Sequence, residues 1–445
     1  MKLSRRSFFA LAGTSAAGTL LASPLEGLIA RQANGHPLFG GGYGSLVPDP
    51  NGLLDLPAGF QYRTFSLTGE LMNDGTLVPG AHDGMAAFPG PRNTVILVRN
   101  HELSPTSGTT AQGPNPYDPF CKGGTTNLVV GANRQLIKHF TSLSGTFRNC
   151  AGGLTPWGSW ITCEENTSTP TSFPLGDRNY VSKFHGYNFE VPASTTTPVK
   201  PEPLIAMGRF NHEAVAVDPK TGIVYETEDR GDSLFYRFIP KVPGKLKEGG
   251  ILQALKFKDI YQAKTFAGFP KGKQFKVEWV TITEPNPVQD TVRQEGFAKG
   301  AAQFARGEGI WYGNGEFYFC CTNGGSTNAS GNPNGFGQVW RYIPGKETIE
   351  LFVESTSREE LDAPDNILVT PYGDLILCED GGGEQFLVGV TPKGELYKFA
   401  RNALNGSELA GACFSPDGKT LFVNIYSPGI TFAIWGPWKR KGHRG

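Results

Sequence analysis

A short apolar run, a Pro/Asp/Gly turn, a run rich in β-branched and aromatic residues and a polar cluster recur in this order along the chain. A run rich in β-branched and aromatic residues predicts a strand, and a Pro/Asp/Gly group between two runs predicts a hairpin. Six such hairpins can be aligned, at residues 85–100, 154–166, 214–230, 310–324, 367–381 and 413–429. This repetition predicts one structural unit used several times.

The hairpins have turn residues that suit tight turns. Segments 218–222 and 415–419 place Pro where φ is fixed and Gly where φ is positive. Several units continue into a third, aromatic strand, at 234–240, 339–344 and 394–400. Each unit therefore resembles one propeller blade, and we predict an all-β, six-bladed β-propeller with long loop insertions.

The predicted units are unevenly spaced. Insertions rich in Gly, Pro and Thr lie at 103–127, 167–180 and 241–300. None has the apolar periodicity of a separate core, so we expect loops or lids on a single domain spanning 36–445. A two-sheet sandwich built from the same hairpins is the alternative fold.

The first residues predict export. Ser4-Arg5-Arg6-Ser7-Phe8-Phe9 is a twin-arginine pattern, and a small-residue apolar run follows at 10–22. We interpret residues 1–35 as a signal peptide for the twin-arginine machinery, which predicts a periplasmic or extracellular protein. A basic N-terminal helix of a cytoplasmic protein is the alternative.

Composition narrows the function classes. The chain has 41 basic and 41 acidic residues, so no net charge favours a nucleic-acid or anionic-membrane partner. Fifty-nine Gly and 33 Pro against 4 Met favour many turns over helical bundles. The seven Cys are an odd number, so at least one thiol is unpaired. We expect a monomer that acts on a small molecule.

Polar residues gather at the ends of the predicted hairpins. The start of the first strand lies beside the end of the second, so both ends share one edge of a blade. In a closed propeller these residues would meet at the mouth of the central channel. They are His82, Asp83, Asn100, His101, Glu102, Cys163, Glu164, Glu165, Asn166, Asn211, His212, Glu213, Glu226, Glu228, Asp229, Arg306, Glu308, Asn323, Asp362, Asp365, Asn366, Glu379 and Asp380.

Carboxylates this numerous would repel one another unless cations lay between them. Clustered oxygen ligands suit calcium, whereas a thiolate with His and carboxylate ligands suits iron or zinc. The alternatives are solvated turn residues for single Glu side chains and a packing or disulfide role for Cys163. We expect packing or disulfide roles for Cys121, Cys150, Cys320, Cys321, Cys378 and Cys413.

Several motifs resemble those of PhoX-type alkaline phosphatases. The most specific is Cys163-Glu164-Glu165-Asn166, preceded by Trp157-Gly-Ser-Trp-Ile-Thr. The others occur in family order over nearly the whole mature chain: Asn100-His101-Glu102, Arg209-Phe-Asn-His212-Glu213, Glu226-Thr-Glu-Asp229-Arg with Leu234-Phe-Tyr-Arg237-Phe, Arg306-Gly307-Glu308, Pro364-Asp365-Asn366, Cys378-Glu379-Asp380 and Cys413-Phe-Ser-Pro-Asp-Gly.

The resemblance implies a six-bladed propeller that hydrolyses phosphate monoesters with Ca²⁺ ions and an oxo-bridged Fe³⁺ pair. It implies that Cys163 is an iron thiolate ligand, that Glu213 and Glu308 are iron-site carboxylates, and that Arg306 binds phosphate. It further implies mainly calcium-ligand roles for Glu164, Glu226, Asp365 and Glu379. Cys163, Arg306 and Glu308 are then the predicted catalytic residues.

The chain departs from the family pattern in two places. Arg306-Gly307-Glu308 replaces the usual Arg-Pro-Glu, and the neighbouring strand ends in Cys320-Cys321-Thr322-Asn323. Two other functions remain open: a calcium-dependent lactonase or esterase without a thiolate ligand, and a non-catalytic exported binding propeller. Iron content and phosphomonoester turnover distinguish the three.

Overall fold

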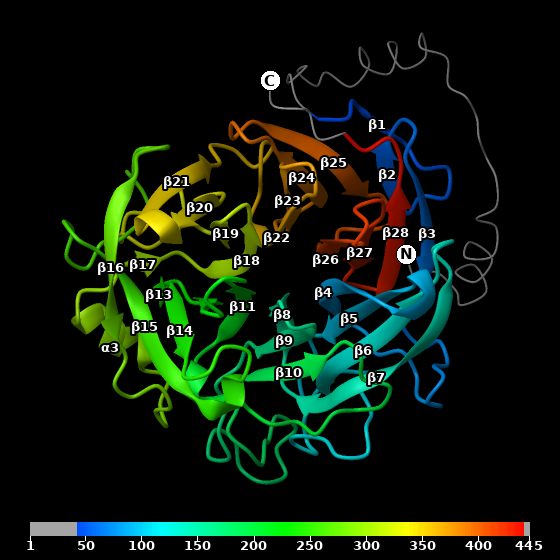
Figure 1. Ribbon diagram of the computed structural model, residues 1–445, viewed down its shortest axis with the longest axis horizontal. Helices are drawn as coiled ribbons and strands as arrows, with labels where there is room; N and C mark the ends of the chain where they lie inside the picture. The colour runs from blue at the N-terminus through cyan, green and yellow to red at the C-terminus, as the bar shows by residue number, and fades with distance from the viewer. Residues whose placement is uncertain (1–41, 440–445) are drawn as a thin grey trace.

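The computed structural model describes residues 42–439, and most of their regular structure is β-strand. The predicted signal peptide at 1–35 lies outside the described residues. Within 42–439, no helix is both long and apolar enough to cross a membrane. The sheets are arranged radially around one axis, as Figure 1 shows.

Two neighbouring sheets are each built from strands that follow one another along the chain. One contains β4 (His82–Pro89), β5 (Val95–His101), β6 (Gly123–Val130) and β7 (Leu136–Thr146). The next contains β8 (Asn149–Leu154), β9 (Ser159–Glu164) and β10 (Asn188–Pro192). Both are antiparallel in chain order.

The largest sheet joins two hairpin units. Its order is β11 (His212–Val217), β12 (Val224–Glu228), β14 (Tyr236–Pro240), β15 (Gly250–Phe257), β16 (Phe275–Thr281), β21 (Thr348–Glu354), β20 (Gln338–Ile343), β19 (Glu316–Cys321) and β18 (Gly307–Gly313). Strand β16 makes the join by pairing with both β15 and β21. A small sheet of β13 (Ser233–Leu234) and β17 (Gln303–Phe304) lies apart from it in the pairing scheme.

The remaining two sheets include both ends of the described chain. One contains β1 (Leu46–Val47), β2 (Leu54–Pro57), β25 (Leu396–Asn402), β24 (Phe386–Val390), β23 (Leu375–Glu379) and β22 (Pro364–Val369). The other contains β26 (Leu409–Phe414), β27 (Leu421–Ile425), β28 (Ile430–Trp435) and β3 (Gln61–Phe65). The pairing of β3 with β28 brings an early strand into the last sheet and so closes the ring.

The innermost strands form a continuous ring. Strands β4, β8, β11, β18, β22 and β26 contact one another in this order, and β26 contacts β4. Figure 1 shows the same strands nearest the axis. The predicted all-β fold with a propeller-like arrangement is therefore confirmed.

The predicted hairpins all form, with two differences. The second unit begins earlier than expected, because the first strand of its hairpin is β8 and residue 154 is only its end. The insertion at 241–300 is not simply a loop, since it contains β15, β16 and helix α3 (Val292–Ala298). The described residues also form short 3-10 helical turns: η1 (Pro91–Asn93), η2 (Ile205–Met207), η3 (Leu246–Glu248) and η4 (Pro344–Lys346).

Small residues allow the inner strands to lie close together. A Cβ atom on Gly153 would lie 1.8 Å from the Val215 carbonyl oxygen, and one on Gly411 would lie 2.3 Å from the Asp83 carbonyl oxygen. Contacts this short are not possible for real side chains, so Gly is required at both positions.

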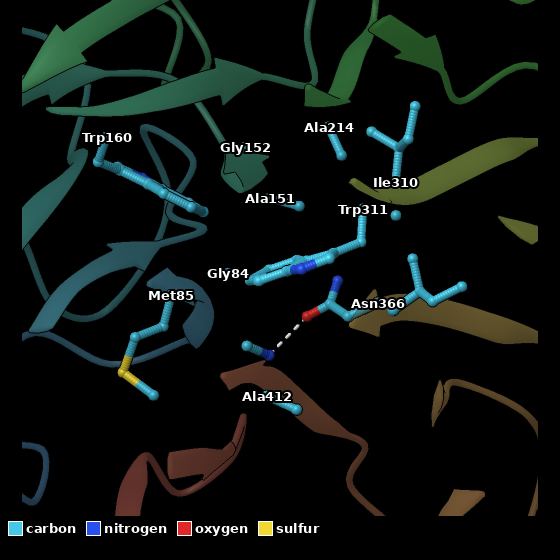
Figure 2. Close-up of a pocket in the computed structure, with 13 residues that line it drawn as sticks. Gly84, Met85, Ala151, Gly152, Trp160, Ala214, Ile310, Trp311, Asn366 and Ala412 are labelled. Carbon is cyan, nitrogen blue, oxygen red and sulfur yellow. Dashed lines mark hydrogen bonds between the residues drawn. The ribbon is translucent and has the colours of Figure 1, made fainter. Parts of the chain in front are cut away.

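A small pocket lies between the inner strands, and Trp311 occupies its middle in Figure 2. Its walls include Ala151, Ala214 and Ala412, which come from three different sheets. Asn366 Oδ1 accepts a hydrogen bond from the Gly411 backbone N–H at 2.5 Å, which links β22 to β26 (Figure 2). The centre of the ring is therefore packed with side chains at this level.

Candidate metal centre

One backbone irregularity recurs in every inner strand. The register with the second strand shifts between His82 and Met85, Asn149 and Gly152, His212 and Val215, Gly307 and Ile310, Pro364 and Ile367, and Ala410 and Cys413. A β-bulge redirects the side chain of the extra residue. The first residue inside the bulge is Asp83, Cys150, Glu213, Glu308, Asp365 or Gly411. Apart from the glycine, each has a side chain that can bind a metal ion.

Four of these bulges begin directly after a residue with left-handed backbone. Ala81, Arg148, Arg306 and Ala363 have φ values of 49°, 50°, 56° and 51°. This conformation costs a non-glycine residue about 1–2 kcal/mol, so the surrounding structure must hold it in place. Repeated strain at equivalent positions of one ring points to a functional site there.

Seven side chains form one continuous set of possible metal ligands. They fall into three groups, and within each group the ligand atoms lie within 4.8 Å of one another: Cys150, Glu165 and Glu213; Glu213, Glu308 and Asp365; Asp365, Asp380 and Glu408. Glu213 belongs to the first two groups and Asp365 to the last two. We call these seven residues the central cluster.

Burial makes the central cluster unfavourable as a set of free anions. It raises the pKa of Glu213 and Glu308 well above the usual range, with neighbouring carboxylates adding to the shift. Burial, followed by Asp380, raises the pKa of Asp365 to about 7. The Cys150 thiol likewise has a raised pKa, because of burial and then the nearby Glu213. Cations would relieve this repulsion, and mixed oxygen and sulfur donors fit hard and softer ions together.

One carboxylate oxygen is particularly suited to accept a cation. Glu308 Oε1 is buried and accepts no hydrogen bond of good geometry, although it lies 2.7 Å from Arg306 Nη2 as an ion pair. Buried polar atoms normally have hydrogen-bond partners. The donor set therefore fits a metal centre at this point of the cluster.

Two arginines border the central cluster. Arg306 donates from Nε and Nη2 to the two carboxylate oxygens of Asp229, at 2.7 and 3.0 Å. Arg148 donates from Nη2 to Glu165 Oε2 at 2.6 Å and from Nε to Glu102 Oε1 at 2.8 Å. Their side chains are 36% and 42% exposed, so both remain accessible from solvent.

Electrostatic interactions with two carboxylates hold the Arg306 side chain in place. The charge of Glu308 is the largest cause of a raised Arg306 pKa. Although burial opposes it, the hydrogen bonds from Arg306 hold the pKa of Asp229 below its usual value. Arg306 is therefore a permanent cation at the edge of the central cluster, in a bidentate orientation.

The structure brings together four of the residues that the sequence singled out. Glu213, Glu308 and Asp365 share one ligand group, and Arg306 contacts Glu308. Glu213 and Glu308 start adjacent inner strands, β11 and β18, which explains their proximity. Asp365 follows on β22, the next strand around the ring.

Four other predicted residues lie elsewhere. Cys163 is fully buried in a hydrophobic cluster with Ile161, Met207 and Phe210. Glu226 Oε2 accepts a hydrogen bond from Asn188 at 2.9 Å and lies 3.3 Å from His212 Nδ1.

The last two of these carboxylates bind backbone and side-chain donors. Glu164 accepts hydrogen bonds from the backbone N–H groups of Phe147 and Gly186, both at 2.9 Å. Glu379 accepts from the Asp362 N–H at 2.9 Å and from Lys398 Nζ at 2.8 Å. These contacts hold local structure, and neither side chain belongs to the central cluster.

Sequence reasoning assigned no metal-ligand role to four members of the central cluster. Glu165 and Asp380 directly follow the predicted Glu164 and Glu379, so the motifs were found but the adjacent residue was chosen. Cys150 was expected to pack or form a disulfide, yet all seven cysteines are free thiols. Glu408 has no surrounding motif that could have indicated a ligand.

Most of the chain matches one known protein family. The family model described as alkaline phosphatase PhoX matches residues 41–429. Among solved structures, the chain is similar to Pseudomonas fluorescens PhoX in complex with vanadate, a transition state analogue. That match has a TM-score of 0.68 and 19% identity, and it covers 86% of this chain and 96% of that one.

Two further solved structures have more distant likenesses. A gluconolactonase from Xanthomonas campestris matches with 13% identity and a TM-score of 0.42, over 90% of this chain and 100% of its own. Regucalcin, a calcium-binding protein from Agrobacterium tumefaciens, matches with 10% identity and a TM-score of 0.41, over 84% and 96%. Among curated protein sequences, none matches significantly.

Proposed function

The chain belongs to the PhoX family of alkaline phosphatases and is a metal-dependent phosphatase, and we propose that the central cluster holds its metal ions. One observation carries this proposal. Carboxylates and one thiol on or beside several inner strands, of which Cys150, Glu165, Glu213 and Glu308 are buried, place their ligand atoms within 4.8 Å of one another in groups that share members. As a set of anions, such an arrangement is stable only when positive charge lies between the ligands.

We propose Cys150, rather than Cys163, as the thiolate ligand of an iron site, together with Glu165 and Glu213. A thiolate favours a transition metal, and Cys150 is the cysteine grouped with these carboxylates. Glu308 and Asp365 continue the iron and calcium sites, and Asp380 and Glu408 supply oxygen ligands that suit calcium. Glu164 and Glu379, in contrast, already accept hydrogen bonds from the protein, and Glu226 accepts one on Oε2 from Asn188.

The substrate in this proposal is a phosphate monoester. Arg306 binds its phosphoryl oxygens, because Nε and Nη2 are held by Asp229 while Nη1 has no partner among residues 42–439. Arg148 has the same arrangement, with Nη1 unpaired in the described part of the chain. When bound, the cations act as Lewis acids toward the phosphoryl oxygens. Fixed cations of this kind stabilise charge that develops during phosphoryl transfer.

The departure at Gly307 is compatible with this role. The Gly307 backbone N–H donates a hydrogen bond to Ser233 Oγ at 3.2 Å, which a proline could not do. Arg306 and Glu308 on either side remain 2.7 Å apart. The glycine therefore replaces the rigidity of proline with a hydrogen bond to β13.

The proposal also includes the number of blades, the export route and the oligomeric state. We count six blades by treating the nine-stranded sheet as two units joined through β16, with one inner strand for each unit. We further propose that residues 1–35 direct export through the twin-arginine machinery, and that a monomeric enzyme acts in the periplasm or outside the cell.

A pair of variants tests the ligand assignment. Glu213→Gln removes a carboxylate from two ligand groups, and Glu226→Gln is the matched control on the paired strand of the same hairpin. We expect Glu213→Gln to lose iron and phosphomonoester turnover, while Glu226→Gln keeps its metal content. Metal analysis and initial rates are measured on the same preparations. Normal iron in Glu213→Gln, or loss of iron only in Glu226→Gln, would contradict the proposal.

A further inference from the structure

A fourth group of ligand-type side chains lies in the loop insertions, separate from the central cluster. Asp118 and Cys121 belong to the loop between β5 and β6, and His185 belongs to the loop between β9 and β10. Their ligand atoms lie within 4.8 Å of one another, and all three residues are buried. We call Asp118, Cys121 and His185 the loop site. It shares no residue with the central cluster.

The distances within the loop site suit tetrahedral metal coordination. Cys121 Sγ lies 3.4 Å from His185 Nε2, and His185 Nε2 lies 3.3 Å from Asp118 Oδ2. Metal bonds of about 2.3 Å to sulfur and about 2.0 Å to nitrogen or oxygen give tetrahedral edges of roughly 3.5 and 3.3 Å. Two of the three donor separations therefore already match those of ligands around one zinc-like ion, and the third is within 4.8 Å.

The orientation of His185 supports the same conclusion. Its Nδ1 lies 2.7 Å from Glu164 Oε1, at hydrogen-bond distance from this carboxylate, while Nε2 faces Cys121 and Asp118. Histidines that bind metals commonly donate their second ring nitrogen to a carboxylate in this way. The role of Glu164 is then to orient His185.

The carboxylate of Asp118 is also held firmly. Its Oδ2 accepts hydrogen bonds from the backbone N–H groups of Ser182 and Lys183, at 2.6 and 2.9 Å. Its Oδ1 accepts from the Phe120 N–H at 3.0 Å. Ligating carboxylates are typically supported by such hydrogen bonds. Both loops therefore contribute to a preorganised site.

A catalytic cysteine is a poorer interpretation of the same residues. Cys121 and His185 are only 5% and 0% exposed, so a substrate has no access to the sulfur. Burial also raises the pKa of the Cys121 thiol, which opposes a reactive thiolate unless a cation is bound. Aromatic rings of Tyr117 and Phe147 lie edge-on to His185 and enclose it further.

We propose that the loop site binds one divalent transition-metal ion of the zinc type, through Asp118, Cys121 and His185, with a water molecule as fourth ligand. A thiolate and a carboxylate balance the charge of such an ion. The ion has a structural role: it fastens the loop between β5 and β6 to the loop between β9 and β10. Strand β9 ends in Glu164, which supports the loop site, and the next residue, Glu165, belongs to the central cluster.

The test uses the full chain with the central thiolate removed. In Cys150→Ser, stripped of metals and reloaded with Co²⁺, we expect a thiolate-to-cobalt absorption band from about one ion, because Co²⁺ held only by carboxylates of the central cluster gives no such band. Adding Cys121→Ser should abolish the band and that ion. Adding Cys413→Ser, which alters a buried cysteine in a hydrophobic cluster, should leave both unchanged.

Two outcomes would overturn the proposal. One is a Cys150→Ser protein without the cobalt band whose Cys121 titrates as a free thiol, which would make the loop site a metal-free hydrogen-bonded group. The other is a band that persists without Cys121. If Cys150→Ser/Cys121→Ser does not fold, Cys150→Ser/Asp118→Asn replaces it, with an expected loss of Co²⁺ affinity of about 10-fold or more. Unchanged affinity in that variant would equally refute the site.

Discussion

Two cysteines in one hairpin offer a decisive test of the central cluster. Cys150 lies in the bulge of β8, and Cys163 lies on the paired strand β9. Both are buried, and the Cys150 sulfur approaches the Cys163 carbonyl oxygen at 3.9 Å. Only Cys150 is grouped with Glu165 and Glu213. Replacing each by Ser makes nearly the same change in volume, so chemistry rather than packing distinguishes the two variants.

The expected effects differ in kind. Cys150→Ser replaces a soft thiolate with a hydroxyl, and we expect phosphatase turnover to fall by about 100-fold or more. Changes to residues that merely support ligands already cost about 10–100-fold in affinity or activity. Cys163→Ser introduces a hydroxyl among Ile161, Met207 and Phe210. This should cost about 1–3 kcal/mol of stability and leave turnover per folded molecule unchanged.

The stability effect can be converted into a thermal shift. With an unfolding entropy of about 2.1 cal/mol/K for each of roughly 400 folded residues, 1–3 kcal/mol corresponds to a Tm decrease of about 1–4 °C. Iron content, Tm and hydrolysis of a generic phosphomonoester should be measured on each preparation. A Cys150→Ser enzyme with full iron and full turnover would refute the reasoning, and so would loss of iron in Cys163→Ser alone.

Three further predictions concern charge, pH and packing. Arg306→Ala should lower kcat/KM for a phosphomonoester by about 10²–10³-fold, as loss of a preorganised donor does, whereas unchanged kinetics would exclude phosphate binding by Arg306. Burial raises the pKa values of Asp365 and Asp380 to about 7 and about 6, so the folded metal-free chain retains protons that the unfolded chain releases. Its stability should therefore decrease as pH rises through 6–7. Calcium added at pH 8 should restore the Tm of chelator-treated protein. A Tm that depends on neither pH nor calcium would contradict this prediction. Gly153→Ala would place Cβ 1.8 Å from the Val215 carbonyl oxygen and should destabilise the fold by about 1–3 kcal/mol or more. Gly231→Ala, whose Cβ would meet no atom of the described residues within 4 Å, should not destabilise it. Equal Tm values for the two variants would show that the inner strands tolerate the added methyl group.

The hairpins were predictable because their pattern is local. Alternating apolar residues and Pro/Gly turns are sufficient to locate strands such as β11 and β12 without knowledge of their neighbours. The exception is β8, whose Asn-Cys-Ala-Gly-Gly-Leu sequence lacks β-branched and aromatic residues. Its glycines are explained only by the adjacent backbone, since Cβ atoms on Gly152 and Gly153 would meet Ile161 and Val215 carbonyl oxygens. The strand that contains Cys150 was therefore missed together with the ligand.

Which member of each acidic pair joins the central cluster could not be predicted, for a related reason. Glu164 and Glu165 are adjacent in sequence, yet one accepts backbone N–H groups and the other faces Arg148 and the central cluster. Simple alternation along a strand does not decide between them, because chain direction changes where the strand ends. The same holds for Glu379 and Asp380, at the end of β23. Sequence motifs locate the channel mouth, whereas the backbone beyond the strand ends decides which side chains join the central cluster.

The proposed metal sites would couple metal binding to closure of the ring. Apart from the join through β16, backbone pairing between strands stays within each sheet. Neighbouring inner strands therefore contact one another mainly through side chains and close backbone approaches. The central cluster crosses these boundaries, from Cys150 on β8 through Glu213 and Asp365 to Glu408 beside β26. An ion that binds the native ring and not the unfolded chain stabilises it by about 2.7 kcal/mol at a hundredfold excess over its Kd. Under the proposed ligand assignment, the ions that equip the enzyme for phosphoryl chemistry would also hold its blades together, in addition to the closure that β3 and β28 provide through backbone pairing.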